Sequence, residues 1–293
     1  MRIVRFDDIE WNHHVNAHRG GGLKFKNLLA GVEGAPENFW LTVAAGDGHF
    51  FSPRHKHNFD QFRVCLAGRT SIDPKKYLVP GEVGYFPEGT SYGPQQDSEE
   101  NLTLVLQFGA ASGSGYASRA QVKRAQDELI KIGEFKDGVF RRREGEGRKN
   151  QDGFEAVWEQ IMGRKLVYPA PRFDDPIFMT HANFGWRPAK GKGVAEKTLG
   201  IFTERETRLQ MVKLEPGAEW TNPAEDAITL AFVMGGRGTC AGQAYDTYAA
   251  IETVSGETAT VRATAETVLL LMVLPMLRAV RALGDRDCSL AAE

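Results

Sequence analysis

The sequence predicts an all-β protein made of two β-barrels joined by a partly helical linker. Three observations predict it. Short apolar segments rich in β-branched and aromatic residues are separated by turn residues, among them the 32 glycines of the chain, which is typical of a sandwich or barrel. These segments form two series, and a stretch with helical periodicity lies between the series. The predicted ranges are 1–109 for the N-terminal barrel, 110–165 for the linker and 166–293 for the C-terminal barrel.

The strands follow from the apolar segments. The first series predicts strands at 39–43, 62–66, 83–86 and 102–108, and the second at 209–214, 228–234, 258–262 and 268–273. The segments Leu-Ala-Gly-Arg (66–69) and Met-Gly-Gly-Arg (234–237) match as the turn after a central strand. We therefore interpret the two series as one barrel that is repeated along the chain.

The linker begins with a flexible segment, Ala-Ala-Ser-Gly-Ser-Gly (110–115). A first helix is predicted directly after it, because Ser118 and Gln121 have the spacing of a capping box. Apolar residues then keep to one stripe, and Gly133 is predicted to close the helix in a left-handed turn. Asp152 and Glu155 repeat this capping pattern before a second helix at 154–162.

The bulk composition limits the partners of the chain. Lys and Arg number 36 and Asp and Glu number 38, which gives a net charge of -2. No excess of charge draws such a chain to nucleic acid or to an anionic membrane. The most apolar run, 268–277, is too short for a membrane helix, which needs roughly 20 residues. We predict neither a nucleic-acid nor a membrane partner.

The cysteines indicate the compartment. Cys65, Cys240 and Cys288 are odd in number, lie far apart and form no C-x-x-C pair. They suggest neither a disulfide framework nor a thiolate zinc site, which fits a reducing cytoplasm. The N-terminal residues also lack the long apolar stretch of a signal peptide. A cytoplasmic location is the expectation.

The residues that indicate a functional site lie in the stretch 48–96. His55 and His57 are separated by one residue, so on a strand both rings face the same side. Gln61 has the same parity if the strand is regular there. The interior of a small barrel is normally apolar, and buried polar groups without partners are costly. The cluster therefore predicts a working pocket inside the N-terminal barrel.

The spacing of this stretch resembles the two motifs of the cupin superfamily. The first motif reads Gly48, six residues, His55-x-His57, three residues, Gln61, six residues, Gly68; the second reads Gly81, five residues, Pro87-x-Gly89, two residues, Tyr92, three residues, Gln96. One extra residue precedes His55. The resemblance implies a double-stranded β-helix, also called a jelly roll. Together with the second series of strands it implies a bicupin, and cupin relatives often form homodimers.

The resemblance also implies a metal site. His55 and His57 match ligand positions, whereas Gln61 replaces the usual glutamate and Tyr92 the usual third histidine. An amide is a neutral donor, and a phenol binds well only when the metal removes its proton. One divalent metal, Fe, Mn, Ni or Zn, is the expected cofactor, and the ligand types do not choose between them. Alternatively, these four side chains line a metal-free pocket as hydrogen-bonding groups.

Further residues are candidates for binding a small-molecule substrate. Arg63 shares the parity of Gln61 and could pair with an anionic group, or it could be a charge at the barrel end. Tyr85 and Gln107 lie on flanking strands and could line the cavity, or serve packing and strand hydrogen bonding instead. We predict Arg63, Tyr85 and Gln107 as substrate-binding residues.

Two functions remain open from the sequence. The first is a metal-dependent cupin enzyme that acts on a small organic molecule, with a dioxygenase as the first expectation from the resemblance. The second is a non-catalytic cupin that binds a small molecule, such as a metabolite sensor. The C-terminal barrel has Pro223, Glu225 and Thr229 at the positions of His55, His57 and Gln61, so a structural role is predicted for it.

Overall fold

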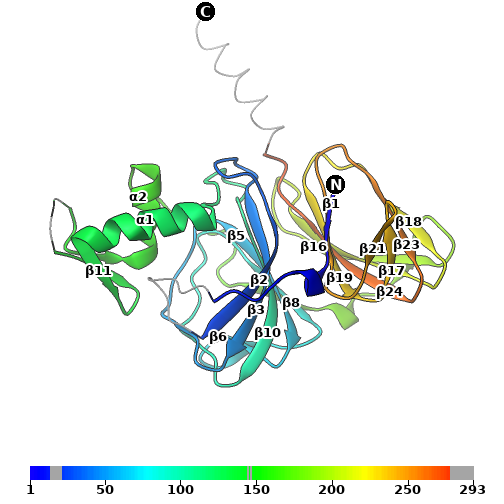
Figure 1. Cartoon of the computed structure of the whole chain (residues 1–293), viewed down its shortest axis with the longest axis horizontal. Coiled ribbons are helices and arrows are strands. Elements are labelled where there is room, and N and C mark those ends of the chain that lie inside the picture. Colours follow the sequence, from blue (N-terminus) through cyan, green and yellow to red (C-terminus); the bar gives the residue numbers. More distant parts are fainter. Residues whose placement is uncertain (14–21, 144, 146, 278–293) are drawn as a thin grey trace, which may run out of the picture. The chain divides into compact units, whose positions relative to one another are not determined.

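The computed structural model describes residues 1–13, 22–143, 145 and 147–277. The described part is mostly β-strand with two α-helices, which confirms the all-β prediction (Figure 1). It divides into two compact units. The N-terminal unit is Trp11–Thr180, and the C-terminal unit combines Met1–Glu10 with the described residues from His181 onward. Within the described residues, no helix is long and apolar enough to cross a membrane.

The N-terminal unit is built on a six-stranded antiparallel sheet. Its order is β14 (Ile177–Thr180), β8 (Glu82–Phe86), β5 (Asp60–Ala67), β10 (Glu100–Phe108), β3 (Phe39–Asp47) and β2 (Leu23–Ala30). Two short two-stranded sheets accompany this sheet: β4 (Phe51–Ser52) pairs with β9 (Gln95–Gln96), and β6 (Thr70–Asp73) pairs with β7 (Lys76–Leu78).

The C-terminal unit has a seven-stranded sheet and a four-stranded sheet. The first runs β1 (Arg2–Val4), β22 (Ala250–Thr253), β19 (Thr229–Gly235), β24 (Thr267–Val273), β17 (Arg208–Leu214), β16 (Val194–Ile201) and β15 (Arg187–Pro188). The second runs β18 (Glu219–Asn222), β23 (Ala259–Ala263), β20 (Gly238–Cys240) and β21 (Gln243–Tyr245). Each strand that the sequence predicted is present in one of the two units.

The strand order repeats between the units. The series β8–β5–β10–β3–β2 has the same order as β22–β19–β24–β17–β16. The matching turns also agree: Gly68 and Gly236 follow the central strands β5 and β19 and have φ of 67° and 105°. A Cβ on Gly68 would lie 2.3 Å from the carbonyl oxygen of Glu100, and one on Gly236 would lie 2.4 Å from that of Glu266. Only glycine fits both the positive φ and the close approach.

The units differ from the predicted ranges at their ends, and the predicted linker at 110–165 lies inside the N-terminal unit. Residues 1–10 belong to the C-terminal unit, because β1 pairs with β22 at its edge. Residues 166–180 belong to the N-terminal unit, because β14 pairs with β8. No closed barrel is found in the described sheets, so each unit is a jelly roll of open sheets. An edge strand distant in sequence completes each large sheet.

The segment between the two strand series forms α1 (Arg119–Ile132) and α2 (Gly153–Met162), with a three-stranded sheet of β11 (Gly133–Lys136), β12 (Val139–Arg142) and β13 (Asn150–Asp152). The capping box of Ser118 and Gln121 is present with both hydrogen bonds. The prediction for Gly133 was wrong: its φ of -169° is extended, because the chain continues directly into β11. Asp152 caps α2 by accepting from the amides of Phe154 and Glu155.

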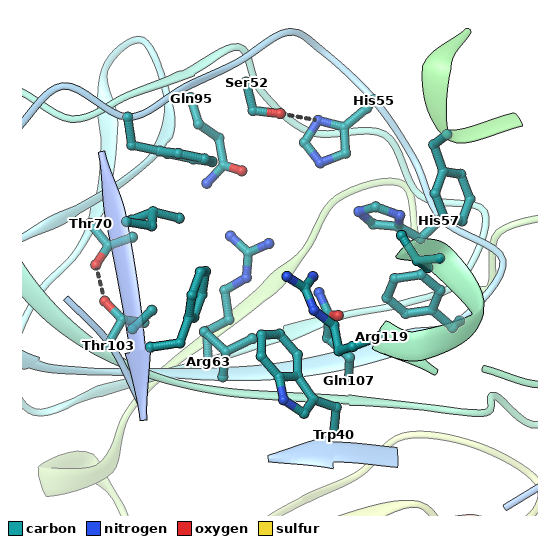
Figure 2. Close-up of a pocket in the computed structure, with 18 of the residues that line it drawn as sticks. Trp40, Ser52, His55, His57, Arg63, Thr70, Gln95, Thr103, Gln107 and Arg119 are labelled. Carbon is teal, nitrogen blue, oxygen red and sulfur yellow. Dashed lines mark hydrogen bonds between the residues drawn. The ribbon is translucent and has the colours of Figure 1, made fainter. Parts of the chain in front are cut away.

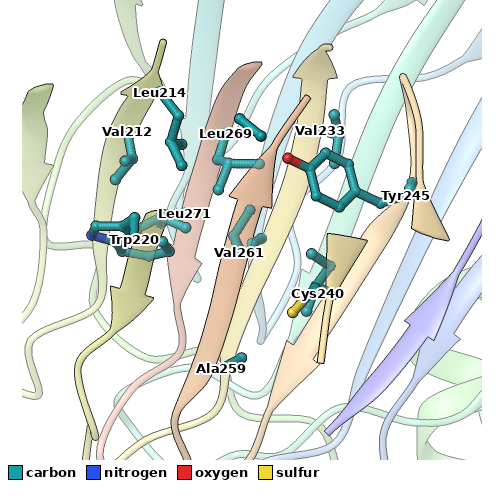
Figure 3. Close-up of a cluster of buried hydrophobic side chains, with 14 of the residues drawn as sticks. Val212, Leu214, Trp220, Val233, Cys240, Tyr245, Ala259, Val261, Leu269 and Leu271 are labelled. Atoms are coloured by element: carbon teal, nitrogen blue, oxygen red, sulfur yellow. The ribbon is translucent and has the colours of Figure 1, made fainter. Parts of the chain in front are cut away.

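The interior of the C-terminal unit is filled with apolar side chains. Val212, Leu214, Trp220, Val233, Leu269 and Leu271 pack between its two sheets (Figure 3). Cys240 and Tyr245 complete this core from the smaller sheet. Glu225 pairs with Arg208, so the carboxylate at a position equivalent to the histidine motif already has a partner. This packing fits the structural role predicted for the C-terminal half.

Candidate functional site

The N-terminal unit holds a cavity of about 160 Å³ (Figure 2). Its walls come from the strands β2, β3, β5 and β10, from the loop before β5, and from the helical segment. Aromatic groups dominate the lining, namely Phe25, Trp40, Phe50, Phe59, Tyr116, Phe154 and Trp158. Polar groups converge among them: Ser52, His55, His57, Arg63, Gln95 and Gln107 all line the cavity.

His55 and His57 lie in the loop between β4 and β5, so the predicted continuous strand is absent here. His55 forms a single β-bridge with Tyr92, and its side chain lines the cavity. The two imidazoles lie 4.9 Å apart between ring centroids, at 72°. The two histidines therefore lie together at the cavity, as predicted. The backbone that holds them is an isolated bridge and a bend rather than the strand on which the prediction was based.

The hydrogen bonds of His55 assign its tautomer. Its Nδ1 lies 2.6 Å from the carbonyl oxygen of Pro53 and 3.2 Å from Oγ of Ser52. A carbonyl oxygen only accepts, so Nδ1 carries the proton and, in the neutral ring, Nε2 carries the lone pair. Figure 2 shows this second nitrogen on the cavity side of the ring. The ring is thus oriented to accept a hydrogen bond or to bind a metal.

His57 is held by aromatic packing. Its ring stacks on Phe59 with centroids 4.4 Å apart and meets the edge of Phe154 at 5.0 Å. Phe154 comes from α2, so the helical segment takes part in positioning this histidine. The sequence indicated no such contact, because α2 is almost a hundred residues away along the chain.

A network of hydrogen bonds joins the other predicted residues. Gln61 donates through Nε2 to the hydroxyl of Tyr92 at 2.9 Å, and Gln107 donates to Oε1 of Gln61 at 3.1 Å. Nη2 of Arg63 donates to both oxygens, at 3.0 Å to Gln61 and 2.9 Å to Tyr92. Tyr116 extends the network by donating to Oε1 of Gln107 at 2.9 Å. Gln61, Arg63, Tyr92 and Gln107 are therefore brought together as one polar cluster.

Arg63 changes what this cluster can bind. The two oxygens expected to ligate a metal, Oε1 of Gln61 and the Tyr92 hydroxyl, both accept hydrogen bonds from its guanidinium. The four predicted ligands include no carboxylate to balance a divalent charge beside that cation. Among the described residues, no group of three or more His, Cys, Asp or Glu is arranged to hold a metal. Gln61 and Tyr92 therefore do not fit the predicted metal centre, which leaves His55 and His57 as its remaining predicted ligands.

Tyr85 does not line the cavity, so its prediction as a substrate-binding residue was wrong. It pairs with Phe62 across β5 and β8 and shares the face of Phe62, which is opposite to that of Gln61 and Arg63. It is fully buried, and its hydroxyl donates to Asp60 at 2.9 Å. Gln107 has the opposite outcome: it pairs with Gln61 across β10 and β5 and lines the cavity.

Behind the cavity lies a buried acidic cluster. Asp60 accepts from the hydroxyl of Tyr85 and, at 2.8 Å, from the amide of Glu88. The pKa of Asp60 is raised to about 7, mainly by burial and also by the charge of Glu88, against the lowering effect of its hydrogen bonds. Glu88 itself binds Arg172 at 2.6 Å and the amide of Ser112 at 3.1 Å. This cluster ties the segments that flank the helices to the sheet.

The helical segment supplies cavity residues that sequence reasoning missed. Arg119 begins α1, and Phe154 and Trp158 lie on α2. The guanidinium of Arg119 lies 4.6 Å from the ring centre of Trp40, and burial lowers its pKa. The capping signals in the sequence located the helices, but nothing in it indicated that they cover the cavity.

No family model and no curated protein matches the sequence. Solved structures do match over nearly the whole chain. A protein from Nostoc punctiforme described as a "putative dioxygenase" has a TM-score of 0.61 at 10% identity, covering 94% of this chain and 83% of its own. Oxalate decarboxylase from Bacillus subtilis has a TM-score of 0.54 at 13% identity, covering 93% and 76%.

A third match is a bacterial pirin from Escherichia coli in complex with nickel(II). Its TM-score is 0.52 at 11% identity, and the match covers 94% of this chain and 98% of the pirin. At such low identities these likenesses concern the fold rather than the activity. With the repeated strand order and the jelly-roll sheets, they show that the chain has the cupin fold.

Proposed function

We propose that the chain binds one small organic molecule in the cavity of its N-terminal unit and does so without a metal. The carrying observation is Arg63, whose guanidinium donates to the two oxygens that a metal would need. The cavity has the usual character of a ligand site, with mostly aromatic walls and a few convergent polar groups. This corresponds to the second of the functions left open by the sequence.

Electrostatics favour this function over the four-ligand metal site. A divalent cation held by Gln61 and Tyr92 would have to displace Arg63 from both oxygens. Two like charges that share a site repel, and the predicted ligand set supplies no negative charge to compensate. A neutral or anionic organic molecule meets no such barrier.

A metal-dependent enzyme is the second candidate, and the tautomer of His55 favours it. Its Nδ1 donates to Pro53, which is the orientation that metal-binding histidines commonly show. Among the structural neighbours, oxalate decarboxylase has Mn(II) centres and the pirin holds nickel(II). His55 and His57 would hold the metal, with Fe, Mn, Ni and Zn all compatible with imidazole. When bound, the metal would supply Lewis-acid or dioxygen chemistry at its open positions.

The remaining expectations from the sequence belong to this proposal. We propose a bicupin with one working pocket, a cytoplasmic location, a homodimer, and no nucleic-acid or membrane partner. Size-exclusion chromatography with light scattering checks the dimer, which a monomeric mass would contradict.

The two candidate functions differ in a thermal-shift and metal-content experiment. We expect the purified protein to contain no metal above trace and to gain no stability from Mn²⁺, Fe²⁺, Ni²⁺ or Zn²⁺. A small organic molecule at a hundredfold excess over its Kd should stabilise the protein by about 2.7 kcal/mol. Stoichiometric metal in the wild type that is lost in both His55→Ala and His57→Ala would support the enzyme instead.

Arg63→Met sharpens this experiment. The substitution removes the charge but keeps most of the apolar stem, so Gln61 and Tyr92 regain the freedom to bind a metal. We expect Ni²⁺ to stabilise this variant but not the wild type. Arg69→Met, at a half-buried arginine that pairs with Glu99, is the matched control and should behave as the wild type. Equal Ni²⁺ responses in wild type and Arg63→Met would contradict the role given to Arg63.

A further inference from the structure

We infer that the ligand of the cavity is a small aromatic carboxylate, with its acid group bound by Arg119 and Arg63 and its ring against the aromatic walls. This inference rests on the proposed function and names the substrate class of the same site. It follows from three properties of the cavity: its charge, its unused hydrogen-bond donors and its shape.

The cavity has an excess of positive charge. Two guanidiniums, Arg63 and Arg119, and one carboxylate, Asp97, line it. The oxygens of Asp97 already accept from the amide of Ser71 at 2.9 Å and from Asn101 at 3.0 Å. Among the described residues no carboxylate oxygen lies within 4.0 Å of a nitrogen of either arginine, although the charge of Arg63 acts on Asp97 and opposes the effect of burial, which raises the pKa of that carboxyl. A ligand with a negative charge is the complement of this lining.

Arg119 is an arginine in need of an acceptor. Its guanidinium makes no hydrogen bond to the described residues, and its Nη2 is buried. It lies over Trp40 at 4.6 Å and near Phe25 at 5.7 Å, both measured to the ring centres. Aromatic faces attract the cation but accept no conventional hydrogen bond. A buried donor without a partner is costly, and a carboxylate offers two oxygens in the geometry that a guanidinium fork prefers.

Arg63 approaches from the sheet. Its Nη2 is used by Gln61 and Tyr92, whereas its Nε is buried without a hydrogen-bond partner among the described residues. Figure 2 shows the guanidiniums of Arg63 and Arg119 both extending into the cavity, one from β5 and one from the start of α1. The Gln61–Tyr92 network thus keeps Arg63 in place as the second binding group for the acid.

The size and walls of the cavity select the rest of the ligand. A volume of about 160 Å³ is close to that of apolar protein cavities of about 150 Å³ that take up benzene. Trp40, Phe59, Phe154 and Trp158 supply flat apolar surfaces. The space thus suits one six-membered ring with a short acid group.

Isothermal titration calorimetry with benzoate, the neutral isostere benzamide and inorganic phosphate tests the inference. We expect the wild type to bind benzoate at least about tenfold more tightly than benzamide. Loss of a charge-assisted hydrogen bond in Arg119→Gln should weaken benzoate binding by about 10- to 100-fold and leave benzamide unchanged. Arg124→Gln is the matched control, because Arg124 lies on the same helix but pairs with Glu33 at the surface. It should bind benzoate like the wild type.

The other outcomes overturn the inference. Equal affinity for benzoate and benzamide, no loss in a folded Arg119→Gln, or phosphate binding as tightly as benzoate would each contradict it. Arg119→Lys, which keeps the charge, should restore part of the affinity and guards against a mere packing defect. Failure of the wild type to bind benzoate also overturns it. The proposed function fails separately, if the wild type holds stoichiometric metal or if no small organic molecule stabilises it in the thermal-shift experiment.

Discussion

Arg63 lines the cavity and lies two residues beyond Gln61 on β5, so the two side chains share one face of the sheet. The sequence predicted this shared parity, and it assigned Gln61 and Tyr92 as metal ligands, although weaker ones than the usual glutamate and histidine. It did not predict that the guanidinium folds back onto both oxygens. Side chains alternate between the two faces of a strand, so the sequence predicts which face Arg63 lies on. Its hydrogen-bond partners depend instead on residues that other segments bring into contact with β5.

Asp60 shows the opposite case, in which the neighbouring residue on the same strand turns away from the cavity. It contacts Tyr85 and Glu88, and it is fully buried. The sequence contained no signal for this acidic cluster, because its partners come from different segments. Its raised pKa has a consequence for stability.

We predict that stability declines as the pH rises from about 4 to 7 on account of Asp60. Its pKa is raised from 3.8 to about 7 by burial. The folded state therefore holds a proton that the unfolded state has already lost, and folding becomes less favourable as that proton dissociates. The side chain introduced by Asp60→Asn cannot ionise. The free energy of unfolding of this variant should therefore increase relative to that of the wild type between pH 5 and pH 8. Chemical denaturation at both pH values measures this difference.

A matched control isolates the effect of Asp60. Asp127→Asn changes an exposed carboxylate on α1 that pairs with Lys123, and it should leave the pH dependence of the wild type intact. A parallel pH dependence of Asp60→Asn and wild type would show that Asp60 does not titrate in this range.

At the scale of elements, α1 and α2 convert an open sheet face into a cavity. They pack on each other through Ala125, Leu129, Ala156 and Val157, with Phe140 of β12 between them. The sequence predicted both helices and their caps because capping is a local interaction. It assigned them to a linker, because which face of which sheet a helix covers depends on contacts distant in sequence.

The cap of α2 offers a test of this role. Asp152→Ala removes the side chain that accepts from the amides of Phe154 and Glu155, which should cost about 1 kcal/mol of stability. Because Phe154 and Trp158 line the cavity, we also expect weaker ligand binding. Asp152→Ser keeps a capping oxygen and should retain most of both properties. Calorimetry measures stability and binding together, and an Asp152→Ala variant that equals the wild type in both would contradict the role of the cap.

At the scale of the whole molecule, one strand order supports two different interiors. The N-terminal unit keeps a polar-lined cavity, whereas apolar side chains fill the space between the sheets of the C-terminal unit. The sequence predicted this division from the absence of histidines in the second series. It missed the edge strands, because pairing of β1 with β22 joins residues about 250 positions apart.

The two interiors should respond differently to the same substitution. Leu269→Ala removes a fully buried side chain from the filled core, and such changes cost about 2–5 kcal/mol. Leu23→Ala removes a half-buried side chain at the wall of an existing cavity, so we expect a smaller loss. Differential scanning calorimetry of the two variants compares them directly. A larger loss for Leu23→Ala would show that the C-terminal interior is the looser of the two.

The sequence by itself determined the strands, the two helices with their N-terminal caps, the repeated turn glycines and the position of the histidine pair. These features follow from local periodicity, hydrogen bonding within a few residues, and backbone sterics. The tertiary structure alone decided that Arg63 occupies the oxygens of Gln61 and Tyr92, that Tyr85 faces away, and that Arg119 and α2 complete the cavity. Each of these depends on register and packing between segments distant along the chain, and the pattern of a single segment does not encode them.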